Sequence, residues 1–285
     1  MTQTILPHIA PEGLQRARGR AEVAMRADGG RNRLERLYQQ GCAKAILPRS
    51  HARLPEAVLV NTSGGITGGD RLDYVMTAGD GAGLVVTTQA AERIYRAASG
   101  VGQIETRLTL GAGAELAWLP QETIVFDGGR LRRELEVDLA PDARFVALES
   151  FVFGREAMGE TVGHAFVRDR WRIRRDGVPL HGDDLRFDIA DPAATAGAAR
   201  LADNRAVATL VLVAPDDAET LDRLVADARG LLGETTAGAS RIGEGASGKI
   251  AIRIAAPSAY LLRRRLLPVI SLFLDGLPLP KVWNL

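Results

Sequence analysis

Cysteine, net charge and long apolar runs are scarce in this chain of 285 residues. Cys42 is the only cysteine, which excludes an internal disulfide and a zinc site built from several cysteines. The formal net charge of +1 provides no basic field for nucleic acid. No apolar run approaches the roughly 20 residues of a membrane helix, and the start of the chain lacks a secretory pattern. We therefore expect a soluble, cytoplasmic protein with protein or small-molecule partners.

Recognisable catalytic and metal-binding motifs are also missing. The histidines, His8, His51, His164 and His181, do not occur in H-x-H, H-x-x-x-H or H-E-x-x-H spacing. There is no G-x-S-x-G elbow, and Cys42 has no obvious local histidine partner. The sequence therefore predicts no stably bound cofactor and favours a binding or scaffold protein over an enzyme.

Alternation of polar and apolar residues dominates the first two thirds of the chain. "ELEVDL" (134–139) and "RWRIRR" (170–175) are typical of half-buried strands. Three longer segments share the order strand, tight turn, alanine, strand, and their turn alanines Ala82, Ala114 and Ala143 lie 32 and 29 residues apart. A period of about 30 residues predicts stacked hairpins. Common turn chemistry is the alternative explanation.

The pattern changes after about residue 200. "ATLVLVAP" (208–215) and "GKIAIRIAAP" (248–257) predict two strands, each followed by a helix. The first helix is expected to end at Gly233. The second is expected to begin at a capping Ser258 and to be interrupted or kinked near Pro268.

These patterns predict a mainly β fold: two layers of stacked strands in a β-solenoid-like body, with a small α/β C-terminal part carrying about two helices. The body is expected over residues 1–200 and a βαβα part over 201–285. The small-residue segment 191–200 is expected to connect them, with both parts packed as one structural unit.

The stretch "NTSGGITGGDRL" (61–72) packs four glycines into six positions. A phosphate loop requires Lys and Ser/Thr directly after its last glycine, but Asp70 and Arg71 follow Gly69. The spacing also differs from G-x-G-x-x-G. Phosphate binding is therefore not expected. A turn with glycine at positive φ and a polar loop in which Asp70 is an oxygen ligand both remain open.

Acidic residues are scattered along the chain, and their spacing nominates no acid–base pair. They are Glu122, Asp127, Glu149, Glu156, Glu160 and Asp183. An alternative hypothesis is a β-solenoid carbohydrate-active enzyme that uses Asp70 and Glu122 as acid and base. Such an enzyme requires the two carboxylates in one cleft, roughly 5 to 10 Å apart.

Five blocks of the sequence resemble the UreD family of urease accessory proteins, called UreH in some organisms. The blocks are "NTSGGITGGDRL", "TTQAAERIYRA", "LAWLPQETIVFDGGRLRRELEVDL", "FGREAMGE" and "LPLPKVWNL", in the order and spacing of the family. The resemblance runs from about Ala21 to Leu285.

The resemblance implies a protein that is not an enzyme. It implies that the chain binds the urease apoprotein and UreF, and through UreF the GTPase UreG. GTP hydrolysis by UreG drives insertion of two nickel ions into the urease active site, and UreE is thought to supply the nickel. The implied fold has two layers of strands with a few helices, and a polar channel is the proposed nickel route.

On this resemblance, Asp70, Glu92 and Asp183 are expected to line a weak, transient nickel path. A lone carboxylate binds Ni²⁺ weakly, which suits a conduit. Contacts with partners are expected from Ser63, Gly64, Gly65, Gly68, Gly69, Tyr95, Arg96 and Trp283. The chain departs from many members at Glu92, where they carry a hydroxyl, and at Lys281, where they carry arginine.

Overall fold

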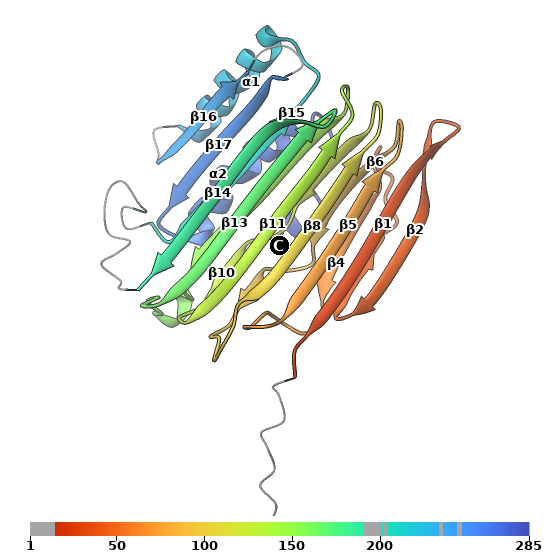
Figure 1. Cartoon of the computed structure of the whole chain (residues 1–285). Coiled ribbons are helices and arrows are strands. Elements are labelled where there is room, and N and C mark those ends of the chain that lie inside the picture. Colours follow the sequence, from red (N-terminus) through yellow and green to blue (C-terminus); the bar gives the residue numbers. More distant parts are fainter. Residues whose placement is uncertain (1–14, 191–200, 202–203, 234–235, 244–246, 285) are drawn as a thin grey trace, which may run out of the picture.

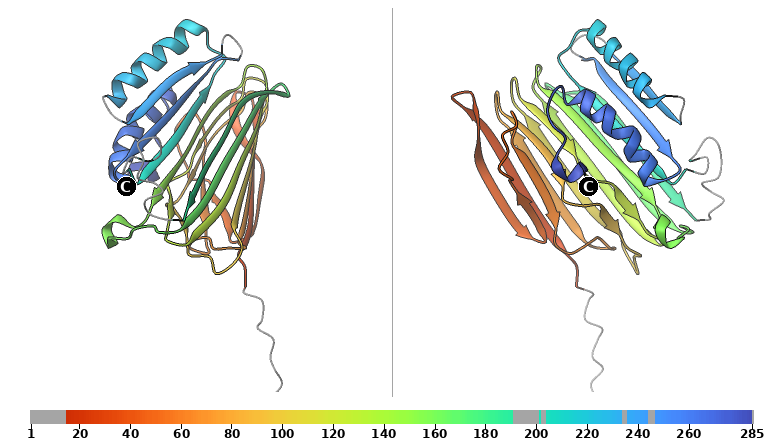
Figure 2. Two further views of the ribbon diagram at one scale, coloured as in Figure 1. Left: turned by 60° about the vertical axis from the view of Figure 1, so that its left-hand side comes forward. Right: turned by 180° about the vertical axis from the view of Figure 1, so that it is seen from behind.

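The computed structural model describes residues 15–190, 201, 204–233, 236–243 and 247–284. Two β-sheets lie face to face, and two helices cover the outer face of one of them (Figure 1 and Figure 2). The predicted fold is confirmed: a mainly β, solenoid-like body and two helices in the C-terminal part. The expected connection 191–200 lies outside the described residues, and so does the boundary placed after residue 200.

The first sheet has seven strands and one face in water. Its strands are β1 Arg18–Asp28, β2 Arg31–Gly41, β5 Arg71–Ala78, β8 Gly102–Leu110, β11 Gly129–Leu139, β13 Ala165–Arg175 and β14 Val178–Ile189. The order is β14-β13-β11-β8-β5-β1-β2, parallel throughout except for the antiparallel edge strands β2 and β14. In β11, buried and more exposed positions alternate, as expected when one face of a sheet is solvated.

The second sheet has ten strands. They are β3 Ala43–Ile46, β4 Glu56–Asn61, β6 Gly83–Thr88, β7 Glu92–Ile94, β9 Glu115–Leu119, β10 Thr123–Val125, β12 Arg144–Phe153, β15 Ala206–Val213, β16 Ala237–Ile242 and β17 Lys249–Ala256. The main order is β16-β17-β15-β12-β9-β6-β4-β3, and β7 and β10 extend it beside β12. β15 is buried at every position, because the sheet is covered on both faces there.

The predicted repeat forms the stacked turns between the two sheets. Ala82, Ala114 and Ala143 are buried, and each donates its N–H to the carbonyl three residues earlier. Successive coils bond to one another as well: Glu115 N–H donates to Ala82 O and Arg144 N–H to Ala114 O. The predicted stacking with a period of about 30 residues is therefore confirmed, but the predicted hairpins are wrong: the two strands joined by each turn belong to different sheets and pair in parallel with the next coil.

The two helices are α1 Ala218–Leu232 and α2 Ala259–Phe273. α1 ends at Gly233, which has a φ of 63°, and Ser258 Oγ accepts the N–H of Leu261, so the predicted end and cap are confirmed. Of the predicted interruption or kink, the interruption is wrong, because α2 continues through Pro268; a kink stays a prediction. The buried face of α2, which includes Leu266 and Ile270, packs on the sheet and holds the helix across this residue.

The C-terminal part also contains a strand that the sequence pattern does not reveal. β16 has only one buried residue, Ala239, and pairs with β17 at the edge of the sheet. The order is therefore βαββα rather than the expected βαβα. None of the helices in the described ranges has the length and hydropathy of a membrane span.

Within the described residues, two short 3₁₀ helices are η1 Glu156–Met158 and η4 Lys281–Asn284. η4 places Trp283 against the outer face of β9, where its indole N–H donates to Leu119 O at 3.1 Å. Arg263 of α2 lies over the ring, 4.8 Å from its centroid. The C-terminal tail therefore continues the helical cover of the ten-stranded sheet.

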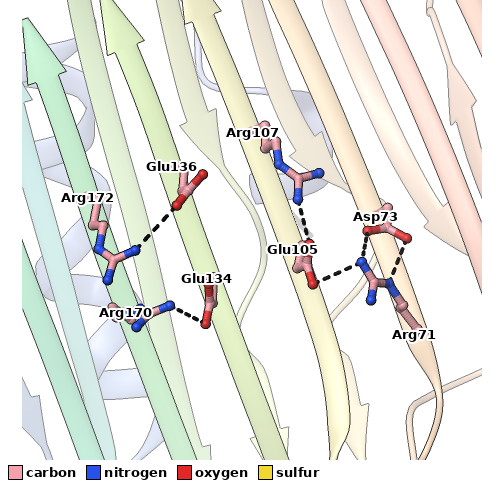
Figure 3. A network of polar contacts seen from close by, with 8 residues as sticks. All are labelled: Arg71, Asp73, Glu105, Arg107, Glu134, Glu136, Arg170 and Arg172. Carbon is pink, nitrogen blue, oxygen red and sulfur yellow. Dashed lines mark hydrogen bonds and ion pairs between the residues drawn. The ribbon is translucent and has the colours of Figure 1, made fainter. Parts of the chain in front are cut away.

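Ion pairs cover much of the outer face of the seven-stranded sheet (Figure 3). Arg71 bonds both Asp73, on its own strand, and Glu105 on β8. Arg170 and Glu134 pair across β13 and β11 at 2.6 Å. Cross-strand pairs of opposite charge suit a solvated sheet face.

Candidate functional site

The glycine-rich loop lies between β4 and β5, and the chain itself approaches its glycines. A β-carbon on Gly65, whose φ is 153°, would lie 2.3 Å from the ring of Tyr95. One on Gly68 would lie 2.0 Å from Ser99 O. The glycines therefore permit close packing against the segment that carries Tyr95 and Ser99.

Asp70, at the end of this loop, is buried and holds the loop through hydrogen bonds to backbone amides. Its carboxylate accepts the backbone N–H of Ala17 and of Thr67, each at 2.8 Å, and the residue is 6% exposed. The carboxylate is therefore not a lone group, because each oxygen accepts a backbone N–H of the chain. A role of Asp70 in a nickel path stays a prediction.

The predicted contact residues around the loop form a surface beside it. Ser63 Oγ lies 2.6 Å from Asn61 Oδ1 and supports the turn. Tyr95 is 39% exposed and packs edge-on against Phe126 at 5.1 Å. Arg96 is exposed and pairs with Asp127. Ser63 and Tyr95 therefore contact Gly65 and Gly64, respectively, and the Arg96 carbonyl accepts the hydroxyl of Thr67 in the same loop.

A cavity of about 130 Å³ opens next to the loop. It is lined by Asn61, Gly64, Tyr74 and residues 88–93, which include Glu92. The Glu92 carboxylate accepts the side-chain amide of Asn61 at 3.1 Å and the N–H of Arg93 at 2.9 Å. Burial raises the pKa of Glu92 above that of an ordinary carboxyl. The cavity therefore offers a desolvated carboxylate that a proton or a metal cation can neutralise.

Two aromatic side chains connect this cavity with the space between the sheets. Tyr74 is buried, which raises the pKa of its hydroxyl, and its ring centroid lies 6.3 Å from that of Trp118. The indole N–H of Trp118 donates to Glu149 Oε1 at 2.9 Å. Side chains in contact thus lead from the cavity to a charged cluster in the core.

This buried cluster consists of Arg133, Glu149 and Asp169, all at most 4% exposed. Arg133 binds Asp169 through two hydrogen bonds of 2.9 and 3.0 Å and also pairs with Glu149. Its other contacts are Thr123 Oγ1 at 3.1 Å and the face of Phe151 at 4.3 Å. The guanidinium group of Arg133 thus binds one carboxylate from each sheet, Asp169 of the seven-stranded sheet and Glu149 of the ten-stranded sheet.

Burial dominates the electrostatics of this cluster. Burial raises the pKa of Glu149 to about 7, and Asp169 adds to the shift while Arg133 opposes it. With both acids ionised the cluster carries one excess negative charge in a medium of low dielectric. It can therefore accept a proton or compensate a cation near neutral pH.

Sequence reasoning missed the cluster, although a signal was present. Glu149 is named from the sequence only as one of the scattered acidic residues, and neither Arg133 nor Asp169 is nominated. In β11, Arg133 is at one of the alternating positions that face the core, as are Leu131 and Leu135. In β13, Asp169 is at such a position, as is Val167. A charged residue at an inward position of a strand marks a buried polar site.

The remaining predicted residues lie elsewhere. Asp183 of β14 pairs with Arg253 of β17. Four strand steps separate β14 from β5, which follows Asp70, so these two residues are at least about 19 Å apart at the usual strand spacing. Among the described residues, no three His, Cys, Asp or Glu side chains form a group that could hold a metal. A conduit through these residues would therefore consist of separated carboxylates.

Glu122 and Trp283 belong to the outer face of the ten-stranded sheet. Glu122 pairs with Arg263 at 3.6 Å, and Trp283 is 2% exposed. The body of the chain thus covers Trp283. Asp70 accepts the N–H groups of Ala17 and Thr67, and Glu122 pairs with Arg263, so no described contact joins the two acids of the enzyme alternative.

Comparison with known proteins adds an independent finding. The sequence model described as "UreD urease accessory protein" matches residues 17–284. A "Urease accessory protein UreD" of Chelativorans sp. (strain BNC1) is 46% identical over 100% of both chains. Proteins of the same name from Rhizobium etli and Agrobacterium fabrum are 47% and 45% identical, over 95% and 96% of this chain and 96% and 94% of theirs.

Proposed function

The chain belongs to the UreD family of urease accessory proteins, and on that basis we propose that it is a non-catalytic scaffold for GTP-dependent insertion of nickel into urease. In this proposal it binds apo-urease and the UreF–UreG complex in the cytoplasm. UreG hydrolyses the GTP, and UreE supplies nickel without contacting this chain. The observation that carries the proposal is the family match over nearly the whole chain.

Nickel is the cargo in this proposal, and the interior of the sandwich suits its passage. Glu92 in the cavity and Glu149 in the core are desolvated carboxylates with raised pKa values. Each can exchange a proton for a cation, and the buried rings of Tyr74 and Trp118 lie between them. Arg133 competes with the ion for Glu149 and Asp169. Binding therefore stays weak enough for release.

The test measures nickel content and urease activity beside a pull-down of the complex. Glu92→Gln and Glu149→Gln remove a charge but keep an acceptor for Asn61 and Trp118, respectively. Both variants should assemble normally and load less nickel. The control is Asp138→Asn on the outer face, where the carboxylate is 60% exposed. Full urease activation by both variants would contradict the path, and failure of the wild-type chain to bind UreF or urease would contradict the scaffold.

Asp70 and Asp183 stay in the proposal as further members of the path. Asp70→Asn is a less clean test, because one amide group would face a backbone N–H that the carboxylate now accepts. A lost buried hydrogen bond of this kind costs about 1–3 kcal/mol. The nickel content of urease loaded with the Asp70→Asn variant must therefore be compared with a measurement of the folding of this variant.

A further inference from the structure

The charges on the outer face of the seven-stranded sheet are balanced over most of its area, but not at one end of β11 and β13. In the middle of these strands, acids of β11 oppose arginines of β13, as in the pair Glu136–Arg172 (Figure 3). Where both strands begin, Arg130 and Arg132 occupy the equivalent positions of β11. The face therefore changes from ion pairs to a group of cations.

An aromatic ring lies at the centre of this group. Phe166 of β13 is half-buried, and the guanidinium carbons of Arg130, Arg132 and Arg186 lie 5.6, 6.0 and 5.6 Å from its centroid. Arg130, Arg132, Phe166 and Arg186 are called the Arg–Phe patch below. Arginine over an aromatic face is attracted by the ring, and the ring holds the guanidinium plane in place.

The patch has more positive charge than its neighbours neutralise. Arg186 pairs with Asp188 at 2.7 Å, and the adjacent Arg168 pairs with Asp184 at 2.6 Å. Arg130 and Arg132 are exposed and form no ion pair with any residue that the structure describes. Two positive charges of β11 are therefore uncompensated on a face where the outward arginines of the adjacent strand β13 have acidic partners.

We propose that the Arg–Phe patch docks an acidic segment of a partner protein. Carboxylates of the partner bind the guanidinium groups of Arg130 and Arg132, and an apolar group beside them packs on Phe166. Arginine forms two parallel hydrogen bonds with a carboxylate, and arginine and aromatic residues are enriched where truncation costs most binding energy. The proposal rests on the proposed function for the existence of protein partners.

The surroundings of the patch favour a short acidic segment over an extended polyanion. A nucleic acid or an anionic membrane would place further negative charge against Glu134, Asp184 and Asp188, which border the patch. The chain as a whole carries a formal net charge of only +1. Two or three carboxylates on a protein surface match the two uncompensated cations without meeting these acids.

The test compares two double variants of the full chain in binding UreF and apo-urease. Arg130→Gln with Arg132→Gln removes the uncompensated cations. The matched control is Arg172→Gln with Arg174→Gln, which removes the same charge from the same face but from arginines that already have acidic partners. Calorimetry at two salt concentrations measures each affinity, and thermal unfolding checks that both variants fold equally well.

The patch variant should bind one of the two partners about tenfold more weakly at low salt, with a reduced dependence on salt, while the control stays within about twofold. Phe166→Leu should weaken the same complex by a smaller factor. Unchanged affinity of the patch variant for both partners overturns this inference and leaves the proposed function standing. A wild-type chain that binds neither partner overturns the proposed function and this inference with it.

Two further probes separate other anionic partners. A short DNA duplex and phosphatidylserine vesicles are mixed with the wild-type chain and with the patch variant. The proposal expects no binding of either probe that depends on Arg130 and Arg132. Binding that the patch variant loses assigns the patch to phosphate groups and overturns the assignment to a protein.

Discussion

The two sheets of this sandwich present their outer faces to different surroundings. The outer face of the seven-stranded sheet carries charged side chains in water, whereas helices and the C-terminal tail cover much of the outer face of the ten-stranded sheet (Figure 2). The difference is visible in single strands: β11 alternates between buried and more exposed positions, and β15 is buried throughout. The sequence pattern of a strand therefore reports how many of its faces are covered.

The two outer faces also contribute differently to stability. An exposed ion pair contributes about 0–1 kcal/mol, whereas truncating a buried leucine costs about 2–5 kcal/mol. Most of the stabilisation outside the central core thus comes from the helix-covered side. The seven-stranded sheet can change its surface charges at small cost to the fold, which leaves this face available for contacts with other molecules.

The largest expected effect comes from the residue that links both sheets. Arg133→Met should lower the free energy of unfolding by about 3–5 kcal/mol, because it leaves Glu149 and Asp169 buried without their cation. Urea unfolding of the variant measures the loss. Arg132→Met, on the same strand but exposed, is the control and should change the free energy by at most about 0.5 kcal/mol. Equal values for both variants would contradict the structural importance of the cluster.

A truncation on the helix-covered face should have the next largest effect. Leu210 of β15 is fully buried beneath the helices, and Leu210→Ala should cost about 2–5 kcal/mol. The midpoint of denaturant unfolding gives the value. A loss below about 1 kcal/mol would mean that the helices do not pack tightly on this sheet.

The pH dependence of stability should identify Glu149. Its pKa is raised to about 7 in the folded chain from an ordinary value of 4.5, so the folded state holds a proton that the unfolded state releases. The associated stability is fully present below about pH 4.5 and is lost as the pH rises through about 7.

The Glu149→Gln variant has no carboxyl group at this position, so it should not lose this stability as the pH rises. The stability of the variant relative to the wild-type chain should therefore increase by more than about 1 kcal/mol between about pH 5 and about pH 8. Unfolding midpoints of both proteins at the two pH values provide the measurement. A difference that is independent of pH would show that Glu149 titrates normally.

The smallest effect is expected on the solvated face. Arg172→Ala breaks the 3.6 Å pair with Glu136, in which both side chains are at least 35% exposed. The expected cost is below about 1 kcal/mol and should disappear at high salt. Chemical unfolding with and without added salt tests this expectation. A cost similar to that of Leu210→Ala would remove the contrast between the two faces.

The parts of the fold that short-range patterns govern were predictable from the sequence. The turn alanines Ala82, Ala114 and Ala143 mark the stacked coils, and Gly233 and Ser258 mark helix ends. Each of these signals depends on residues within a few positions. β16 escaped because it lies at the edge of a sheet and buries a single residue, so its pattern carries almost no periodic signal.

The site depends on contacts that local patterns do not encode. Asp70 looks free in the sequence, but its carboxylate binds the N–H of Ala17, 53 residues earlier. Arg133 finds Asp169 at a separation of 36 residues, because β11 and β13 pair in parallel. Inward parity can suggest that such a residue is buried, but only the register of the strands identifies its partner.

The tail that carries Trp283 has a consequence for the order in which the protein is made. Its indole closes over Leu119, and Val282 O accepts the side-chain amide of Gln121. Both residues leave the ribosome more than 160 residues earlier. During synthesis, the apolar surface around Leu119 therefore lacks the cover that Trp283 provides until the tail emerges. Chaperones that bind exposed apolar segments can bind this surface during that interval. A chain released before residue 277 keeps the surface exposed and is prone to aggregate.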